Sequence, residues 1–171
     1  MRDRLPDTID TASLKTLGRE YRGALSVADM TRLVEAVRDT DVPELEVRLQ
    51  VERDAGGVRC VQGEIAGVLH LTCQRCLDQL EFPVRIAFKS ALVRSEAEAE
   101  RLADGYDPLL IEDDRLVVRD LIEDELLLAL PGFPQHGEAQ CALPEYQAGT
   151  SEAAVDEKPS PFAALADLKR N

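Results

Sequence analysis

The 171-residue sequence has no tryptophan, and aromatic residues make up only 4% of it. Aliphatic side chains must therefore fill the core, which a chain of this length can build without disulfide staples because it buries about 70% of its unfolded surface. Only two histidines are present, which leaves little for acid–base catalysis. The sequence also lacks a Gly-rich phosphate-binding loop and a G-x-S-x-G nucleophile motif.

Long apolar runs are missing as well. The longest uncharged aliphatic run is LLLALP, whereas a membrane helix needs about 20 apolar residues. The opening MRDRLPDTID has no apolar h-region, so we expect no secretory signal. We therefore expect a cytoplasmic protein with no membrane partner, in which cysteines are reduced thiols or metal ligands rather than disulfides.

Negative charge is concentrated in the second part of the chain. Residues 1–95 hold 14 basic and 15 acidic side chains, whereas residues 96–171 hold 6 and 18. Nearly the whole net charge of −13 thus lies beyond residue 95. Such a surface repels bare phosphate and attracts basic protein surfaces, although a high net charge also serves solubility alone.

Period-two alternation of apolar and polar residues predicts strands in residues 44–52 (ELEVRLQVE), 58–73 and 79–93. Gly63 or Gly67 predicts a bulge or bend, and Pro83 predicts an edge or a bulge. Short turns between the strands favour an antiparallel meander. The fold class is therefore α+β: an antiparallel β-meander or partial barrel with a few packed helices.

Helical periodicity appears in residues 25–39, with Ser26 as N-cap, and in residues 119–131, where Pro131 ends the helix. We expect Leu128 in the apolar stripe of the second helix. The domain organisation follows: a single α+β domain over 1–141, an acidic flexible linker over 142–160 and a short C-terminal docking helix over 161–171. Its apolar side is predicted to bind this fold or a partner, through Phe162, Leu165 and Leu168.

Four residues form a candidate metal site. Cys73 and Cys76 are spaced C-x2-C, and His136 and Cys141 follow about 60 residues later as H-x4-C, an acceptable but unspecific structural-zinc pattern. His70 is an alternative ligand, and we expect Cys60 to be a buried apolar thiol within a strand. Reduced thiols without metal, or a redox pair, are the alternatives that stay open.

Charged residues give two further hypotheses. Asp120, Glu123, Asp124 and Glu125 crowd the start of the second helix, where we expect an exposed edge that faces a partner rather than a general acid–base site. Scattered arginines of the first half form a candidate RNA-contacting patch, in which we expect Arg75 and Arg85 to contact RNA. The alternative for these arginines is a solvated strand face.

The segments LTCQRCL, LIEDELLLALPGFPQH…C and PFAALADLKR, preceded by LPDTID…L…REYRG, together resemble the YceD family of large ribosomal RNA subunit accumulation proteins. The resemblance implies a bacterial cytosolic factor that supports synthesis, processing or stability of 23S ribosomal RNA. It also implies a family whose genes often lie beside that of a small basic ribosomal protein of the large subunit, and in which no enzymatic activity is established.

The leading hypothesis is a non-catalytic ribosome-biogenesis factor. Its partner would be a large-subunit precursor or a basic ribosomal protein, with 23S rRNA contacted indirectly, because broad phosphate binding needs a basic stripe that the second half lacks. A chaperone for one ribosomal protein is a close variant. The alternative is a zinc- or thiol-dependent enzyme for RNA processing or redox chemistry, which requires an open metal position or a reactive thiol.

Overall fold

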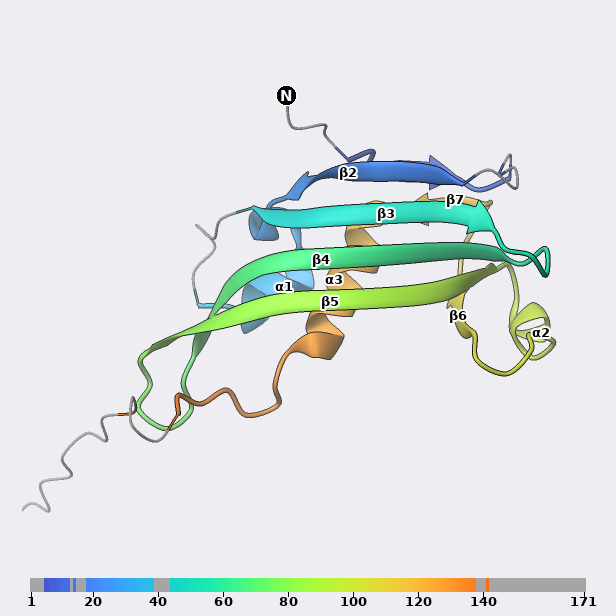
Figure 1. Ribbon diagram of the computed structural model, residues 1–171. Helices are drawn as coiled ribbons and strands as arrows, with labels where there is room; N and C mark the ends of the chain where they lie inside the picture. Colours follow the sequence, from blue (N-terminus) through green and yellow to red (C-terminus); the bar gives the residue numbers. More distant parts are fainter. Residues whose placement is uncertain (1–4, 13, 15–17, 39–43, 138–140, 142–171) are drawn as a thin grey trace, which may run out of the picture.

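Figure 1 shows the computed structural model, which describes residues 5–12, 14, 18–38, 44–137 and 141. The predicted linker 142–160 and docking helix 161–171 lie outside these residues. No helix in the described part of the chain combines the length and apolarity that crossing a membrane requires. The elements in chain order are β1 (Thr8–Asp10), β2 (Arg19–Leu25), the 3-10 helix η1 (Val27–Asp29), α1 (Thr31–Ala36), β3 (Leu45–Arg53), β4 (Arg59–Thr72), β5 (Gln79–Val93), α2 (Glu96–Ala99), β6 (Asp107–Leu110), β7 (Arg115–Val117) and α3 (Val118–Ala129).

A five-stranded sheet in the order β2-β3-β4-β5-β6 forms the body of the molecule. Strands β2 to β5 pair antiparallel in chain order, which confirms the predicted meander and the α+β class. The sheet is open, so the partial-barrel alternative is not the one adopted. Strand β6 departs from the expected pattern because it pairs parallel to β5, and the crossover through α2 makes that direction possible. Strands β1 and β7 form a separate two-stranded sheet.

One face of the sheet is apolar and carries the helices. Every second residue of β3 from Leu45 to Val51 is buried, while the residues between them are exposed. Figure 1 shows α1 and α3 lying against one face of the sheet, where Leu33, Ile122 and Leu126 are fully buried. The core therefore lies between the meander and these two helices.

The two glycines of β4 lie where side chains of the neighbouring strands come close. The register of β4 with β5 is continuous through both Gly63 and Gly67, and the register with β3 is continuous through Gly63 and ends at Ala66, so the predicted bulge is wrong. A Cβ on Gly63 would collide with the ring of Phe88, and one on Gly67 would collide with the side chain of Leu45. Glycine at these positions makes room for large side chains from the neighbouring strands. Pro83 lies where β5 is an edge, because β6 pairs with β5 only from Ser90 onward.

The predicted helix over 25–39 is interrupted. It consists of η1 and α1, separated at Met30, whose φ of −106° and ψ of 98° are extended. Ser26 does cap the first piece, since its hydroxyl accepts a hydrogen bond from Ala28 N at 3.3 Å. Because α1 begins anew at Thr31, the N–H groups of its first turn have no partner within the helix. A side chain from α3 accepts hydrogen bonds from two of them.

Candidate metal centre

The turn between β4 and β5 holds the C-x2-C pair. Strand β4 ends at Thr72 and β5 begins at Gln79. The backbone closes the turn on itself, because Cys73 N donates to Asp78 O and Leu77 N donates to Cys73 O, each at 2.9 Å. Leu77 has a φ of 65°, a left-handed conformation that lets the chain reverse tightly after Cys76. The two sulfurs are thus presented from a hydrogen-bonded turn.

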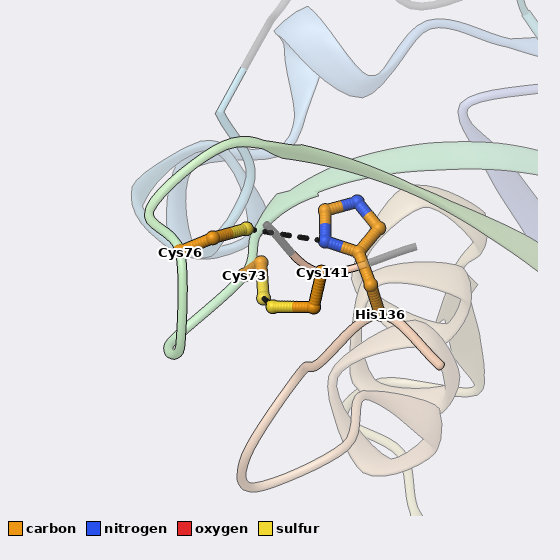
Figure 2. Close-up of side chains that lie close together, drawn as sticks. All are labelled: Cys73, Cys76, His136 and Cys141. Carbon is orange, nitrogen blue, oxygen red and sulfur yellow. Dashed lines mark hydrogen bonds between the residues drawn. The ribbon is translucent and has the colours of Figure 1, made fainter. Parts of the chain in front are cut away.

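The second pair reaches this turn from the other end of the sequence. After α3 the chain passes through Pro131 and Pro134, which cannot continue a helix. Gln74 N donates to Pro134 O at 2.8 Å, which fixes this segment against the C-x2-C turn. Figure 2 shows the result: His136 and Cys141 point toward Cys73 and Cys76.

The four donor atoms lie within 4.8 Å of one another, so the cluster can hold a metal ion. The Cys73 and Cys141 sulfurs are 3.8 Å apart, and the Cys76 sulfur is 3.4 Å from Nδ1 of His136. In a tetrahedral site with metal–sulfur bonds of about 2.3 Å and metal–nitrogen bonds of about 2.05 Å, these distances would be about 3.8 and 3.6 Å. All four cysteines are free thiols rather than disulfides.

The orientation of His136 suits metal binding. Its Nε2 lies 3.0 Å from the carbonyl oxygen of Gln79. A carbonyl only accepts, so Nε2 carries the proton and Nδ1 presents a lone pair to the three sulfurs. Bonding of the second ring nitrogen to a backbone carbonyl is the usual way in which proteins orient a metal-binding histidine. His70, the alternative ligand, is not part of the cluster.

Electrostatics in the cluster favour one thiolate and oppose a second. Burial raises the pKa of Cys73, but N–H groups of the backbone at Cys76, His136 and Arg75 donate to its sulfur and lower the pKa to about 5. Burial, together with the sulfurs of Cys76 and Cys73, raises the pKa of Cys141 to about 11. Without a metal ion, Cys73 is therefore a thiolate at neutral pH and Cys141 stays protonated. A bound metal ion would supply positive charge and hold the remaining thiols deprotonated.

The acidic residues of α3 do not form one exposed edge. The side chains of Asp120 and Asp124 are about half exposed, and Glu125 is half-buried. Glu123 is only 3% exposed, so its expected place on the surface is wrong. Leu128, predicted for the apolar stripe of α3, is 81% exposed, and nothing among the described residues covers it.

Glu123 holds α3 against α1. Its carboxylate accepts hydrogen bonds from Arg32 N at 2.6 Å and Leu33 N at 3.0 Å, the free N–H groups at the start of α1, and from the Arg32 guanidinium at 3.0 Å. Burial raises the pKa of Glu123, but these bonds outweigh it and hold the pKa below its ordinary value. Sequence inspection missed this pairing because a glutamate inside an acidic run looks solvated.

Four arginines of the first half are paired within this chain, and Arg75 and Arg85 are exposed in different places. Arg48, Arg53, Arg59 and Arg94 bond to carboxylates or carbonyls of this chain. Arg75 is exposed on the C-x2-C turn, and Arg85 is exposed on the open face of β5. Six residues of strand separate Arg85 from Gln79 at the edge of that turn, a distance of roughly 20 Å. The structure therefore places the two residues in separate surroundings, and Phe162, Leu165 and Leu168 lie outside the described residues.

Sequence inspection also missed a supporting residue of the metal cluster. Gln79 acts through its backbone carbonyl, for which no side-chain pattern exists. Arg38 likewise fixes the turn, because its guanidinium donates to Leu77 O at 2.9 Å. Only its position next to a predicted helix end would have hinted at this role.

Comparisons with known proteins identify the family of this chain. The sequence profile of the family described as large ribosomal RNA subunit accumulation protein YceD matches residues 61–169, a span that includes all four cluster residues. The large ribosomal RNA subunit accumulation protein YceD of Haemophilus influenzae is 30% identical over 172 residues, which cover 98% of this chain and 97% of that protein. No solved structure matches the chain. With a match to the family profile over more than half of its residues, and to this relative over nearly all of them, the chain belongs to the YceD family.

Proposed function

We propose that this protein is a non-catalytic factor that supports the accumulation of 23S ribosomal RNA. Family membership over nearly the whole chain is the observation that carries this proposal, because the relative's name states that role. The protein acts by binding a large-subunit precursor through a basic ribosomal protein. The exposed acids of α3 and the excess of acidic residues beyond residue 95 support a cationic partner over bare RNA.

The metal of the Cys73, Cys76, His136 and Cys141 cluster is zinc in this proposal. Three thiolates and one imidazole at near-tetrahedral spacing are the donors of structural zinc sites. When bound, zinc crosslinks the β4–β5 turn to the segment that follows α3. Four protein ligands leave no open position for water, so the site stabilises structure and catalyses no reaction.

Complementation tests the proposed function. In Haemophilus influenzae cells that lack their own relative, expression of this protein should restore the ratio of 23S to 16S rRNA. A tagged copy crosslinked in growing cells should bring down a basic ribosomal protein of the large subunit. Recovery of naked 23S rRNA segments without ribosomal protein would contradict the proposed partner, and an unchanged rRNA ratio would contradict the function itself.

A thiol-dependent enzyme is the second candidate, favoured by the lowered pKa of Cys73, because a thiolate at neutral pH is a nucleophile. However, the Cys73 side chain is fully buried, and the C-x2-C pair connects two strands rather than opening a helix. Alkylation with iodoacetamide and turnover assays with insulin disulfide and with precursor rRNA distinguish the candidates. Fast modification of the zinc-loaded protein, or turnover that Cys73→Ser abolishes, would favour the enzyme.

A further inference from the structure

A groove lies between the β6–β7 connection and the start of α3, in the part of the molecule away from the cysteine cluster. It has a volume of about 430 Å³. Leu109 and Leu110 of β6, Val117 of β7 and Leu121 of α3 supply its apolar lining. Figure 1 places β6 and β7 toward the end of the sheet opposite the β4–β5 turn. The groove is therefore separate from the cluster described above.

Two of the apolar side chains that line the groove are exposed. Leu110 is 57% and Val117 37% exposed, although both carry large aliphatic side chains. Leu121 beneath them is buried in the core, so the lining has a fixed base in α3. Exposed aliphatic side chains that line a concave surface mark a site where another molecule removes them from water.

Carboxylates surround this lining. Glu112 and Asp113 lie on the β6–β7 side, Asp120 and Asp124 lie on the α3 side, and Arg115 is the single basic residue that lines the groove. Two arginines outside the lining pair with the α3 carboxylates, Arg119 with Asp120 at 3.5 Å and Arg32 with Asp124 at 2.7 Å. Glu112 and Asp113 are exposed and form no ion pair with other described residues. Their charge is therefore available to a ligand.

A second carboxylate pair raises the negative potential further. Burial raises the pKa of Glu125, and the charges of Asp107 and Asp124 raise it as well. Asp107 at the start of β6 and Glu125 on α3 thus repel each other, although neither of them lines the groove. A cationic ligand would relieve this repulsion, whereas a phosphate would add to it.

We propose that this groove binds a basic polypeptide segment, which inserts one or two large aliphatic side chains against Leu110 and Val117 and places lysine or arginine against Glu112, Asp113, Asp120 and Asp124. The inference rests on the proposed function and gives its partner a binding site and a chemistry. The apolar lining and the acidic rim are both required: the first gives affinity, and the second selects cationic sequence over RNA.

The test uses a fluorescent twelve-residue peptide of lysine and arginine with two leucines four positions apart. Its binding to the full chain is followed by fluorescence anisotropy, and the site is located by the shifts of backbone amide NMR signals. We expect the shifts to cluster at β6, β7 and the first turns of α3. A control peptide with both leucines replaced by serine, and a twelve-nucleotide RNA, should each bind at least about tenfold more weakly.

Variants with matched controls locate the interaction. Leu110→Ser should weaken binding of the leucine peptide about tenfold, because it removes an apolar contact from the groove. Leu128→Ser, at a leucine outside the groove that is more exposed than Leu110, should leave the affinity unchanged. Asp120→Lys should weaken binding about tenfold in low salt and less in 0.5 M salt, whereas Glu100→Lys on the surface after α2 should not. Thermal melting confirms that each variant is folded.

The outcomes separate this inference from the proposed function. Three results would contradict the proposed binding site: equal weakening of peptide binding by Leu110→Ser and Leu128→Ser, NMR shifts that cluster elsewhere, or tighter binding of the RNA than of the peptide. If the tagged wild-type protein brings down a basic ribosomal protein from cells and Leu110→Ser brings down as much, the groove is wrong while the proposed function stands. If peptide binding behaves as expected but rRNA accumulation does not depend on the protein, the groove stands and the function is wrong.

Discussion

The two ends of the β4–β5 hairpin are fastened by different chemistry. At the turn, three cysteines and His136 converge on one point. At the open end, the carboxylate of Asp114 accepts hydrogen bonds from the guanidinium of Arg59 at the start of β4 and from that of Arg94 just beyond β5, each at 2.6 Å. The carbonyl of Asp114 also accepts from Thr11 N at 2.8 Å. A candidate metal site thus lies at one end of the hairpin. The ion-pair cluster of Asp114 with Arg59 and Arg94, here called the carboxylate hub, lies at the other end.

This difference determines which conditions loosen each end. Thiolate–metal bonds depend on a metal ion and on reduced, deprotonated sulfur. The carboxylate hub needs neither, but it loses its attraction when Asp114 is protonated, and its exposed part is screened by salt. Chelators should therefore act on the turn alone, and acid should act on both ends.

Loss of one cysteine ligand should have the largest effect. Cys73→Ser removes a thiolate from the cluster, so purified protein should lose its equivalent of zinc by elemental analysis. At a free zinc concentration of about a thousand times the Kd of the wild type, the variant should melt about 10 °C below the wild type, because it lacks the stabilisation by bound zinc. A strong chelator should lower the melting temperature of the wild type to the same value and leave the variant unchanged.

Cys60 offers the matched control for that experiment. It is buried, like Cys73, but lies at the opposite end of β4 and outside the cluster. Cys60→Ala should retain one equivalent of zinc and its sensitivity to the chelator. A Cys73→Ser protein that keeps stoichiometric zinc would contradict the assignment of the site.

Removal of the hub carboxylate should come next. Asp114→Asn removes the close anionic partner of the 7%-exposed Arg59 and leaves it only the carboxylate of Glu98 at 3.9 Å, and loss of a close partner from a buried ion pair destabilises proteins. We expect the melting temperature to fall by about 5 °C or more. The chelator should still act on this variant, because its metal site is intact.

Asp113→Asn is the control for the hub. Asp113 and Asp114 both have positive φ, 48° and 56°, which asparagine also tolerates, but Asp113 is exposed and unpaired among the described residues. Its melting temperature should change by no more than about 1 °C. Equal losses for both variants would mean that backbone strain, not the Arg59 pair, causes the effect.

The same contrast explains what could be predicted from the sequence. The cluster follows a spacing rule, C-x2-C and H-x4-C, so all four residues were found, although the sequence left His136 and His70 as alternatives. Strands β3, β4 and β5 follow a two-residue period and were also found, whereas β2, with its mostly exposed or half-buried residues, was not. These features are local patterns whose chemistry forces particular residue types into particular positions.

The hub and the Glu123 cap could not be found in this way. Asp114 and Arg59 are 55 positions apart, and Glu123 and Arg32 are 91 positions apart. No period or motif connects them, and acids within acidic runs look solvated. The same reason explains the errors at Gly63 and Gly67, whose space is filled by side chains from other strands. Such contacts arise only once the topology is known.

Acid should weaken the hub with a defined sign. Hydrogen bonds from Arg94 and Arg59 lower the pKa of Asp114 below its ordinary value of 3.8. A carboxyl group with a lowered folded pKa contributes stability above its unfolded pKa and loses it as the pH falls through the folded value. The stability difference between wild type and Asp114→Asn should stay constant from pH 7 to about 5 and shrink below about 4. The stabilities are compared by urea midpoints of proteins that also carry Cys73→Ser, so that acid release of metal from the cluster does not contribute. A stability difference that grows as the pH falls would contradict the expected sign.

The smallest expected effect has the opposite sign. Burial, with the charges of Asp107 and Asp124, raises the pKa of Glu125, so its ionised form opposes folding at neutral pH. Glu125→Gln should therefore raise the melting temperature at pH 7 by about 1–2 °C, and the gain should vanish as acid protonates the wild-type carboxyl. The same substitution should leave zinc content unchanged, because Glu125 lies outside the cysteine cluster. A destabilised Glu125→Gln protein at pH 7 would show that Glu125 makes a favourable contact, and the repulsion inferred between β6 and α3 would then be wrong.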